Sequence, residues 1–141
     1  MEIKIERITE TAKLPTRAHD NDAGLDLYSD ENLILLKGKH GCVKTNIKIE
    51  IPDNYVGLVW DKSGLSKKHG IHTLAGVIDS GYRGEIIITL ANLGLVDYKI
   101  EKGQKIAQLL IQPIAILKII EKKIDEQTER GSSGFGSTGL Y

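Results

Sequence analysis

The sequence predicts an all-β domain of many short strands, either a sandwich or a barrel. Two observations support this fold class: short apolar runs are separated by glycine, asparagine and aspartate, and no long segment has the apolar period of a helix. The length of 141 residues suffices for one domain with a buried core and is short for two. We therefore expect a single all-β domain.

The first half of the chain contains four predicted strands. Ile3 and Ile5 alternate with charged residues and form the first strand. Residues 25–30 alternate more weakly, and residues 33–36 are a short apolar run. The clearest alternation covers residues 43–51, where Val, Thr and Ile alternate with Lys, Asn and Glu. That segment is expected to be a strand with one side facing solvent.

The second half contains the remaining strands and one short helix. Residues 55–60 form a strand, and residues 63–70 have room for one or two helical turns that end at a glycine. Within residues 76–88, apolar β-branched residues flank a short polar turn, which predicts a β-hairpin with Asp79 at its tip. Further strands are expected over residues 86–90, 97–100, 106–111 and 114–119.

Two segments are apolar on both faces of their predicted strands. They are Ile86-Ile87-Ile88 and Leu109-Leu110-Ile111. A strand at the surface of a sandwich needs only one apolar face. We therefore expect a second surface, belonging to another copy of the chain, to cover the outer faces.

Composition excludes several classes of protein. The 19 basic residues equal the 19 acidic residues, so no overall charge attracts nucleic acid or a membrane surface, and any phosphate binding must be local. Cys42 is the only cysteine, which excludes an internal disulfide and fits a reducing compartment. The N-terminus lacks a signal-peptide pattern, and polar residues interrupt the apolar region 106–120. The expectation is a cytoplasmic protein with neither nucleic-acid nor membrane partners.

The predicted hairpin turn brings together groups that can bind a small molecule. Asp79 supplies a carboxylate, Tyr82 supplies an aromatic ring, and neighbouring glycines let a ligand approach the backbone. The same residues are also ordinary turn formers. From this stretch alone, a ligand site and a purely structural turn are both possible.

The last stretch combines a linker-like composition with two unusual side chains. Residues 131–139 are glycine, serine and threonine apart from Phe135, which predicts a flexible tail. Arg130 can grip a phosphate, Phe135 can cover a base, and a glycine-rich backbone can offer N–H groups to anions. A Walker-type phosphate loop is excluded because the stretch has no Gly-Lys-Ser or Gly-Lys-Thr and no helix follows.

Five stretches stand out in order along the chain: Ala23-Gly24-Leu25-Asp26-Leu27, Lys62-Ser63-Gly64-Leu65, the segment from Gly76 to Gly84, the segment from Gly103 to Leu109, and the segment from Arg130 to Gly139. Taken together, they resemble the five motifs of the trimeric dUTP diphosphatases, and the match spans nearly the whole chain. The resemblance implies a jelly-roll protomer over residues 1–125, a flexible lid over residues 126–141, and a homotrimer with active sites at subunit interfaces. It also implies hydrolysis of dUTP to dUMP and pyrophosphate with Mg²⁺ on the triphosphate, which keeps uracil out of DNA and supplies dUMP for dTMP synthesis.

The resemblance also implies roles for individual residues. Asp79 is the general base that deprotonates the attacking water, and Tyr82 lies against the deoxyribose, where a ribose 2′-hydroxyl has no room. Uracil binds the backbone around Gly76, Val77 and Ile78, with Thr73 nearby. Asp26 is expected to contact the metal only through water.

The implied phosphate contacts come from residues far apart in the sequence. Ser63, Gly64 and Gln108 hold the phosphate chain. Arg130 lies on the γ-phosphate, and Phe135 stacks over uracil, with Gly136, Ser137 and Thr138 completing the lid. This chain departs from the family at Lys62, where the family usually has arginine. Lysine keeps the charge but loses the planar two-pronged grip.

Two other functions stay open on the sequence. The dCTP deaminases resemble this family in fold and rely on a glutamate, for which Glu85 is the candidate, and a bifunctional enzyme is a variant of that alternative. Tyr82 and the complete tail motif favour the diphosphatase instead. A nucleotide-sensing protein on the same fold is the second alternative, although binding alone does not need the general base Asp79.

Overall fold

The computed structural model describes residues 2–125, 127–128 and 131–132. Within these residues the chain forms eleven strands and one short helix, α1 (Ser63–His69), which confirms the all-β class. The strands are β1 (Lys4–Arg7), β2 (Leu25–Tyr28), β3 (Leu33–Leu35), β4 (His40–Lys44), β5 (Ile47–Glu50), β6 (Tyr55–Asp61), β7 (Ile71–Leu74), β8 (Val77–Ile78), β9 (Ile87–Asn92), β10 (Tyr98–Ile100) and β11 (Lys105–Pro113).

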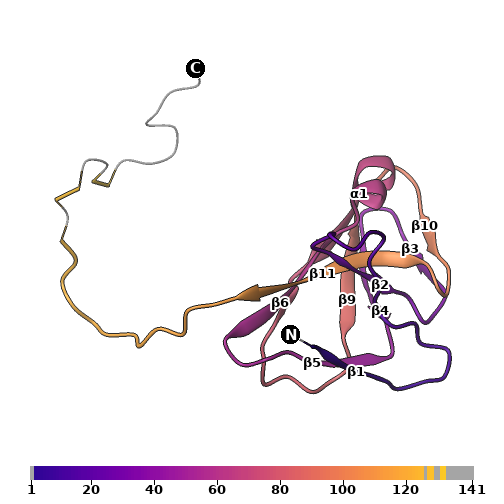
Figure 1. Cartoon of the computed structure of the whole chain (residues 1–141). Coiled ribbons are helices and arrows are strands. Elements are labelled where there is room, and N and C mark those ends of the chain that lie inside the picture. The colour runs from indigo at the N-terminus through magenta and orange to yellow at the C-terminus, as the bar shows by residue number, and fades with distance from the viewer. Residues whose placement is uncertain (1, 126, 129–130, 133–141) are drawn as a thin grey trace.

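The strands form four antiparallel groups around one interior (Figure 1). The longest strand, β11, pairs with β2 on one side and with β6 on the other, and β8 lies on the outer side of β6. In the second sheet β9 lies between β4 and β7. The pairs β1–β5 and β3–β10 complete the molecule. Short antiparallel strands in facing sheets make up a jelly-roll sandwich.

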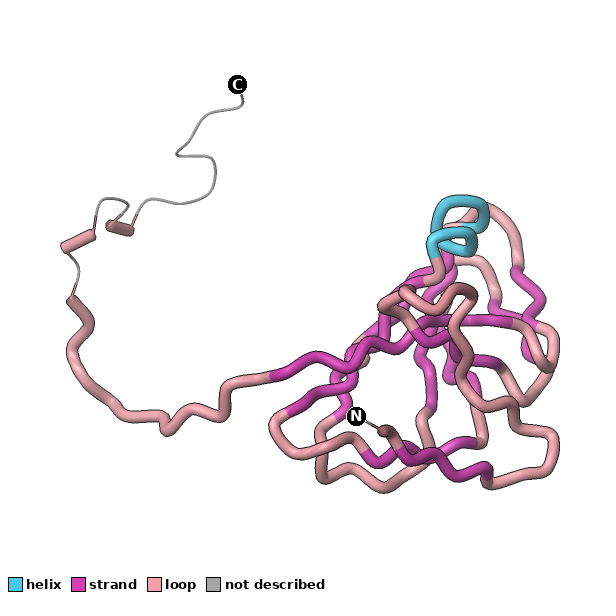
Figure 2. Tube along the Cα trace, viewed as in Figure 1, coloured by secondary structure: helices cyan, strands magenta, loops and turns pink. Residues whose placement is uncertain are grey.

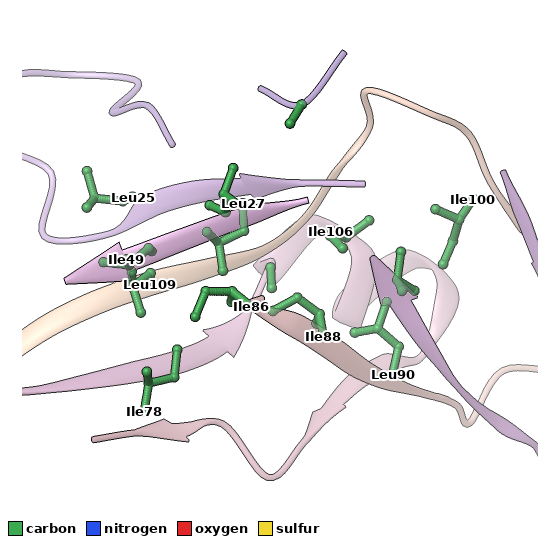
Figure 3. Close-up of a cluster of buried hydrophobic side chains, with 14 of the residues drawn as sticks. Leu25, Leu27, Ile49, Ile78, Ile86, Ile88, Leu90, Ile100, Ile106 and Leu109 are labelled. Carbon is green, nitrogen blue, oxygen red and sulfur yellow. The ribbon is translucent and has the colours of Figure 1, made fainter. Parts of the chain in front are cut away.

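The core collects the inward-facing apolar side chains of all four groups. Figure 3 shows Leu27 of β2, Ile49 of β5, Ile88 of β9 and Leu109 of β11 converging on one interior. Leu27 and Leu109 have no exposed surface, and Ile49 is only 1% exposed. Burying each such side chain stabilises the fold by roughly 1.5–3 kcal/mol. The described part of the chain contains no helix long and apolar enough to cross a membrane.

The short helix confirms its prediction and follows known rules for helix ends. Gly70 ends the helix in the left-handed conformation, with φ of 67°. Its N–H donates to the carbonyl of Ser66 at 2.9 Å. Basic residues fill the last turn, where they favour the negative end of the helix dipole.

The strand predicted over residues 43–51 is in fact two strands, and this part of the prediction is wrong. The chain turns at Asn46, whose φ is 51°, so that β4 pairs with β9 and β5 pairs with β1. The alternation continues across the break because both halves face the same core: Val43 and Thr45 before the turn are buried, and Ile47 after it is also buried.

The predicted β-hairpin over residues 76–88 is also wrong. β8 pairs with β6, whereas β9 pairs with β4 and β7, so the two strands belong to different sheets. A turn begins at Asp79, because the N–H of Tyr82 donates to the Asp79 carbonyl at 3.0 Å. The N–H of Ile86 then bonds to the carbonyl of Ile47 at 2.9 Å. Asp79 therefore lies on a connection between two sheets.

The strand predicted over residues 114–119 does not form. β11 ends at Pro113, and the N–H of Ile114 makes one hydrogen bond to the carbonyl of Asn54 at 2.9 Å. Beyond that point the chain leaves the body as a long loop (Figure 2). Leu117 and Ile119 are 79% and 95% exposed, and the segment pairs with no strand among residues 2–125. In contrast, β7 forms where the sequence predicted no strand.

Candidate active site

The residues predicted to bind the nucleoside lie together around one cavity of about 250 Å³, which we call the β8 pocket. Its walls include Gly76, Val77, Ile78, Asp79 and Tyr82, all five of them sequence-predicted site residues. Ile78 is buried, whereas Asp79 is exposed. The remaining lining residues are Val59, Ala75, Glu85, Ile86 and Ile87.

The backbone of β8 is free to bind a planar ligand. β8 pairs only with β6 and is the last strand of its sheet, so its other edge has no strand partner among the described residues. Unpaired N–H and C=O groups on an edge strand are ready to pair with another molecule. Gly76 leads into this edge with φ of 110°, and a Cβ there would come 2.9 Å from the carbonyl oxygen of Val59. Only glycine fits this close approach.

The ring of Tyr82 has a defined place beside the pocket. Its hydroxyl donates to the backbone carbonyl of Glu85 at 3.0 Å, and the side chain is 46% exposed. A Cβ on Gly84 would overlap the Tyr82 hydroxyl, so the absence of a side chain at Gly84 makes room for the ring. The carboxylate of Asp79 accepts no hydrogen bond from residues 2–125, which leaves it available to a ligand or to water.

Glu85 has a structural partner. Its carboxylate accepts the N–H of Asn46 at 2.9 Å, and Asn46 is the left-handed residue that separates β4 from β5. The Asn46 side-chain amide in turn donates to the buried carboxylate of Asp30 at 2.8 Å. Glu85 therefore ties the wall of the β8 pocket to the turn between two strands.

Two of the residues predicted to bind phosphates lie around a second cavity of about 570 Å³, which we call the α1 pocket. Ser63 and Gln108 line it together with Asp61. The Gln108 side-chain amide donates to the Asp61 carbonyl at 2.9 Å, which fixes its orientation. The side chain of Gln108 covers Gly24, where a Cβ would overlap its amide oxygen. Gly64 lies exposed in the first helical turn, whose leading N–H groups have no partner within the helix.

Asp61 holds Thr73 and His72 beside this pocket. Its carboxylate accepts the N–H of Thr73 at 2.6 Å, the Thr73 hydroxyl at 2.8 Å, and His72 Nδ1 lies 2.8 Å away. Burial alone would raise the pKa of Asp61, but these hydrogen bonds outweigh it and hold the pKa below its usual range. Thr73 lies in a neighbouring cavity that shares Gly76 and Val77 with the β8 pocket, and its hydroxyl proton is directed to Asp61.

Asp26 lies at the centre of a cluster of positive charge. It is 4% exposed, with the Lys62 ammonium 2.6 Å from Oδ1 and the Lys105 ammonium 2.6 Å from Oδ2. Burial alone would raise the pKa of Asp26, but Lys105 and Lys62 outweigh it and hold the pKa below its usual range. Asp26, Lys62 and Gln108 line a cavity of about 330 Å³ that we call the Asp26 pocket.

The structure separates the predicted site into two places. The β8 pocket and the α1 pocket share no lining residue. The predicted lid residues Arg130, Phe135, Gly136, Ser137 and Thr138 lie outside the described residues.

The sequence interpretation missed three contacts at these pockets. They are the ion pair of Lys105, the Asp61 carboxylate under Thr73, and the anchoring of Glu85. Lys105 belongs to the fourth motif and directly precedes the apolar pair Ile106-Ala107, so the motif marked the residue but not its partner. The Asp61 and Glu85 contacts join residues far apart in sequence and had no such signal.

Comparison with known protein families and sequences identifies relatives of this chain. The chain matches the family model described as dUTPase over residues 10–139. It is 49% identical over 139 residues to the deoxyuridine 5'-triphosphate nucleotidohydrolase of Clostridium tetani, and the match covers 97% of this chain and 96% of that protein. The protein of the same name from Clostridium acetobutylicum is 45% identical over 140 residues, with coverage of 98% and 97%.

Solved structures have the same fold at lower identity. A mutant dUTPase of Staphylococcus bacteriophage 80alpha, bound to dUpNHpp, matches with a TM-score of 0.93 at 31% identity over 99% of both chains. A mutant dUTPase of phage phi11 of S. aureus, whose structure concerns the coordination of a structural Mg(II) ion, matches with a TM-score of 0.84 at 28% identity, over 89% of this chain and 99% of that chain. The family model, the relatives and the fold agree, and the chain belongs to the dUTPase family.

Proposed function

We propose that the chain hydrolyses dUTP to dUMP and pyrophosphate with Asp79 as the general base. Membership of the family makes the chain a dUTP diphosphatase, and the role of Asp79 is the part that we infer. The observation that carries it is an exposed carboxylate with no hydrogen-bond partner in residues 2–125, at the mouth of a pocket with a free strand edge. Asp79 takes a proton from water as the water attacks the α-phosphorus, and the bond to the leaving pyrophosphate breaks.

The free edge of β8 accounts for the preference for uracil over the other pyrimidine bases. Uracil offers one N–H between two carbonyl oxygens, which complements alternating C=O and N–H groups of an extended backbone around Val77 and Ile78. Cytosine has an amine in place of one of these oxygens, so buried donors would be left unpaired at a cost of about 1–3 kcal/mol each. The close approach of Gly76 to Val59 leaves a narrow pocket, which disfavours the additional methyl group of thymine.

Tyr82 accounts for the choice of sugar. The bond from its hydroxyl to the Glu85 carbonyl holds the ring at the wall of the β8 pocket. A deoxyribose can pack its 2′-carbon against this ring, whereas a ribose would bring a hydroxyl group into the contact. UTP is therefore a poor substrate in this proposal.

The phosphates bind to the α1 pocket and the Asp26 pocket. Ser63 and Gln108 offer a hydroxyl and a side-chain amide in the α1 pocket, and Lys62 supplies positive charge in the Asp26 pocket. Gly64 offers a backbone N–H in the first turn of α1. Lys62 is a compact charge on a flexible stem, so it replaces the electrostatic part of an arginine contact without the paired geometry. The lid is proposed to come from Arg130 on the γ-phosphate and Phe135 over uracil, with Gly136, Ser137 and Thr138 around the phosphates.

Mg²⁺ is proposed to arrive on the triphosphate. The described residues contain no group of three or more His, Cys, Asp or Glu side chains that could hold a metal ion. Asp26 supplies one carboxylate, and both of its oxygens lie next to lysine ammonium groups, which suits a contact through metal-bound water better than direct coordination. When bound, the ion would neutralise phosphate charge as pyrophosphate leaves.

We propose a homotrimer with shared active sites, and the separation of the two pockets supports sites that are completed by another copy of the chain. The general base and the phosphate-binding side chains must meet on one substrate, yet the β8 pocket and the α1 pocket have no wall in common. Val77 and Ile87 are 70% and 47% exposed beside the β8 pocket, and Trp60 is 57% exposed beside the α1 pocket. Apolar surface next to half of a site favours its burial by a second copy.

The two alternatives are weaker on the same observations. A deaminase would need Glu85 as a free acid and base, whereas its carboxylate is bonded to the Asn46 N–H at 2.9 Å. A sensor would not need the unpaired carboxylate of Asp79.

The free thiol of Cys42, which is exposed, fits the reducing cytoplasm in which we place the protein.

A product assay tests the proposal. Purified protein with Mg²⁺ receives dUTP, UTP, dTTP or dCTP, and chromatography measures nucleotide and pyrophosphate. We expect turnover of dUTP alone and a fall in kcat of at least about 100-fold for Asp79→Asn. Asp53→Asn is the matched control, because Asp53 is an exposed carboxylate in another turn. Deamination of dCTP would establish the first alternative, and binding of dUTP without turnover would establish the second.

A further inference from the structure

A buried carboxylate shared by two lysines lies beside the proposed phosphate site. Asp26 is 4% exposed and has one ammonium group 2.6 Å from each oxygen. The side chains of Lys62 and Lys105 are 29% and 44% exposed, so both cations reach from solvent to the same buried anion. The three groups together carry one net positive charge. One lysine neutralises Asp26, and the other is surplus to that need.

An irregularity in the central strand directs Lys105 to this carboxylate. The pairing of β11 with β2 shifts between Lys105 and Ala107, which is the mark of a β-bulge. Ile106 and Ala107 are both buried, at 1% and 0% exposure, so two consecutive side chains face the core. Lys105 therefore lies on the opposite face, with Gln108, whose cross-strand partner is Asp26. Without the bulge Lys105 would alternate onto the core side.

The two lysines differ in what they face. Lys62 lines the Asp26 pocket with Gln108 and so borders the place where phosphates are proposed to bind. Lys105 does not line that pocket. For Lys62 to contact a phosphate it must leave Asp26 or share it. Leaving a buried carboxylate without a cation is strongly unfavourable, whereas a carboxylate that keeps one cation remains paired.

We propose that Lys105 is a positioning residue for the triphosphate: it keeps Asp26 paired while Lys62 exchanges that carboxylate for a phosphate. The proposal rests on the proposed function, because it assigns the triphosphate as the new partner of Lys62. A lysine suits this exchange since its compact ammonium moves on a flexible four-carbon stem. The exchange also uncovers one oxygen of Asp26 toward the pocket, where a water on the Mg²⁺ of the substrate can meet it.

Calorimetric binding in EDTA, without Mg²⁺, tests the exchange separately from the metal. The ligands are dUTP and deoxyuridine, and the variants are Lys105→Gln, Lys105→Gln with Asp26→Asn, and Lys99→Gln. Lys99 is the matched control, because it is an exposed lysine paired with Glu101 away from the pockets. We expect Lys105→Gln to weaken dUTP about tenfold or more, since Lys62 then stays on Asp26. Deoxyuridine, which has no phosphate, should bind as to the wild type.

The double variant decides between positioning and direct contact. If Lys105 acts through Asp26, a neutral asparagine there needs no cation, and dUTP affinity returns to within about threefold of wild type. If Lys105 itself binds phosphate, the double variant stays as weak as Lys105→Gln, and the proposal is overturned. Wild-type affinity in Lys105→Gln overturns it as well.

Failure of Lys105→Gln to fold and failure of the wild type to bind ligand have different consequences for the proposal. If Lys105→Gln does not fold, the double variant decides alone, because it retains Lys62 and has no unpaired carboxylate. If the wild-type protein binds neither dUTP nor deoxyuridine, the proposed function fails and this proposal fails with it. That result differs from all of those above, in which wild-type binding is intact.

Discussion

The buried carboxylate of Asp30 makes the stability of the fold depend on pH, and Asp30→Asn tests this dependence. Asp30 is 6% exposed and accepts hydrogen bonds from the hydroxyls of Thr9 and Thr11 at 2.7 Å and 3.0 Å. The Asn46 amide donates at 2.8 Å, and the Lys102 ammonium lies 3.1 Å away. Burial alone would raise the pKa of Asp30, but these donors outweigh it and lower the pKa from 3.8 to about 2.

The sign and size of the effect follow from the two pKa values of Asp30. Because the pKa is lower in the folded chain, the unfolded chain binds the proton first as the pH falls. The stabilisation is therefore complete at neutral pH and is lost as the pH falls from the unfolded value through the folded one. For a change from 3.8 to about 2, the free energy of unfolding falls by about 1 kcal/mol at pH 3 and by about 2 kcal/mol at pH 2.

Urea unfolding at fixed protein concentration, followed by circular dichroism at pH 7, pH 5 and pH 3, measures this loss. We expect Asp30→Asn to be less stable than wild type at pH 7, and to lose about 1 kcal/mol less between pH 5 and pH 3. Glu101→Gln is the control, because Glu101 is exposed and its pair with Lys99 lies in solvent. If wild type and Asp30→Asn lose equal stability between pH 5 and pH 3, the carboxylate that titrates is not Asp30, and the reasoning is refuted.

Three further predictions concern the β8 pocket and the core. Gly84→Ala should reduce the preference for dUTP over UTP, measured as the ratio of kcat/KM values, because a Cβ there displaces the Tyr82 ring. Glu85→Gln should keep dUTP turnover and Glu85→Ala should lose it, because glutamine still accepts the Asn46 N–H; loss of turnover in folded Glu85→Gln would instead make Glu85 a reacting group. Leu27→Ala should lower the free energy of urea unfolding by about 2–5 kcal/mol, since Leu27 is fully buried in a packed core, and a loss below about 1 kcal/mol would contradict this packing.

The fold class was predictable because strand alternation and turn residues are local signals. The period of two told which side chains are buried, and it was correct on both sides of Asn46. It did not tell which strands pair, because alternation is the same whether a chain continues straight or turns into another sheet. The hairpin prediction at Asp79 failed for the same reason: apolar segments on both sides of a turn can pair with each other or, as here, with β6 and β4.

The grouping of candidate site residues was predictable where one motif supplies neighbouring residues. Gly76, Asp79 and Tyr82 lie within one stretch, and the structure places all three at one pocket. Motifs could not predict the ion pair of Asp26 with Lys105, because it depends on a one-residue bulge in β11 that reverses which face Lys105 occupies. A shift of pairing by one residue leaves no trace in composition or spacing.

The segment after β11 carries apolar side chains that lie largely exposed in the described part of the chain. The segment 114–125 leaves Leu117 and Ile119 79% and 95% exposed, so its apolar pattern, which predicted a strand, has no strand partner among residues 2–125. The segment also joins β11, which holds Gln108 in the α1 pocket, to the predicted lid. If the lid acts as proposed, the surface that binds the apolar side chains of residues 114–125 decides which copy's β8 pocket the lid reaches. Under this proposal, the place where segment 114–125 binds matters for the reaction as much as the sequence of the proposed lid.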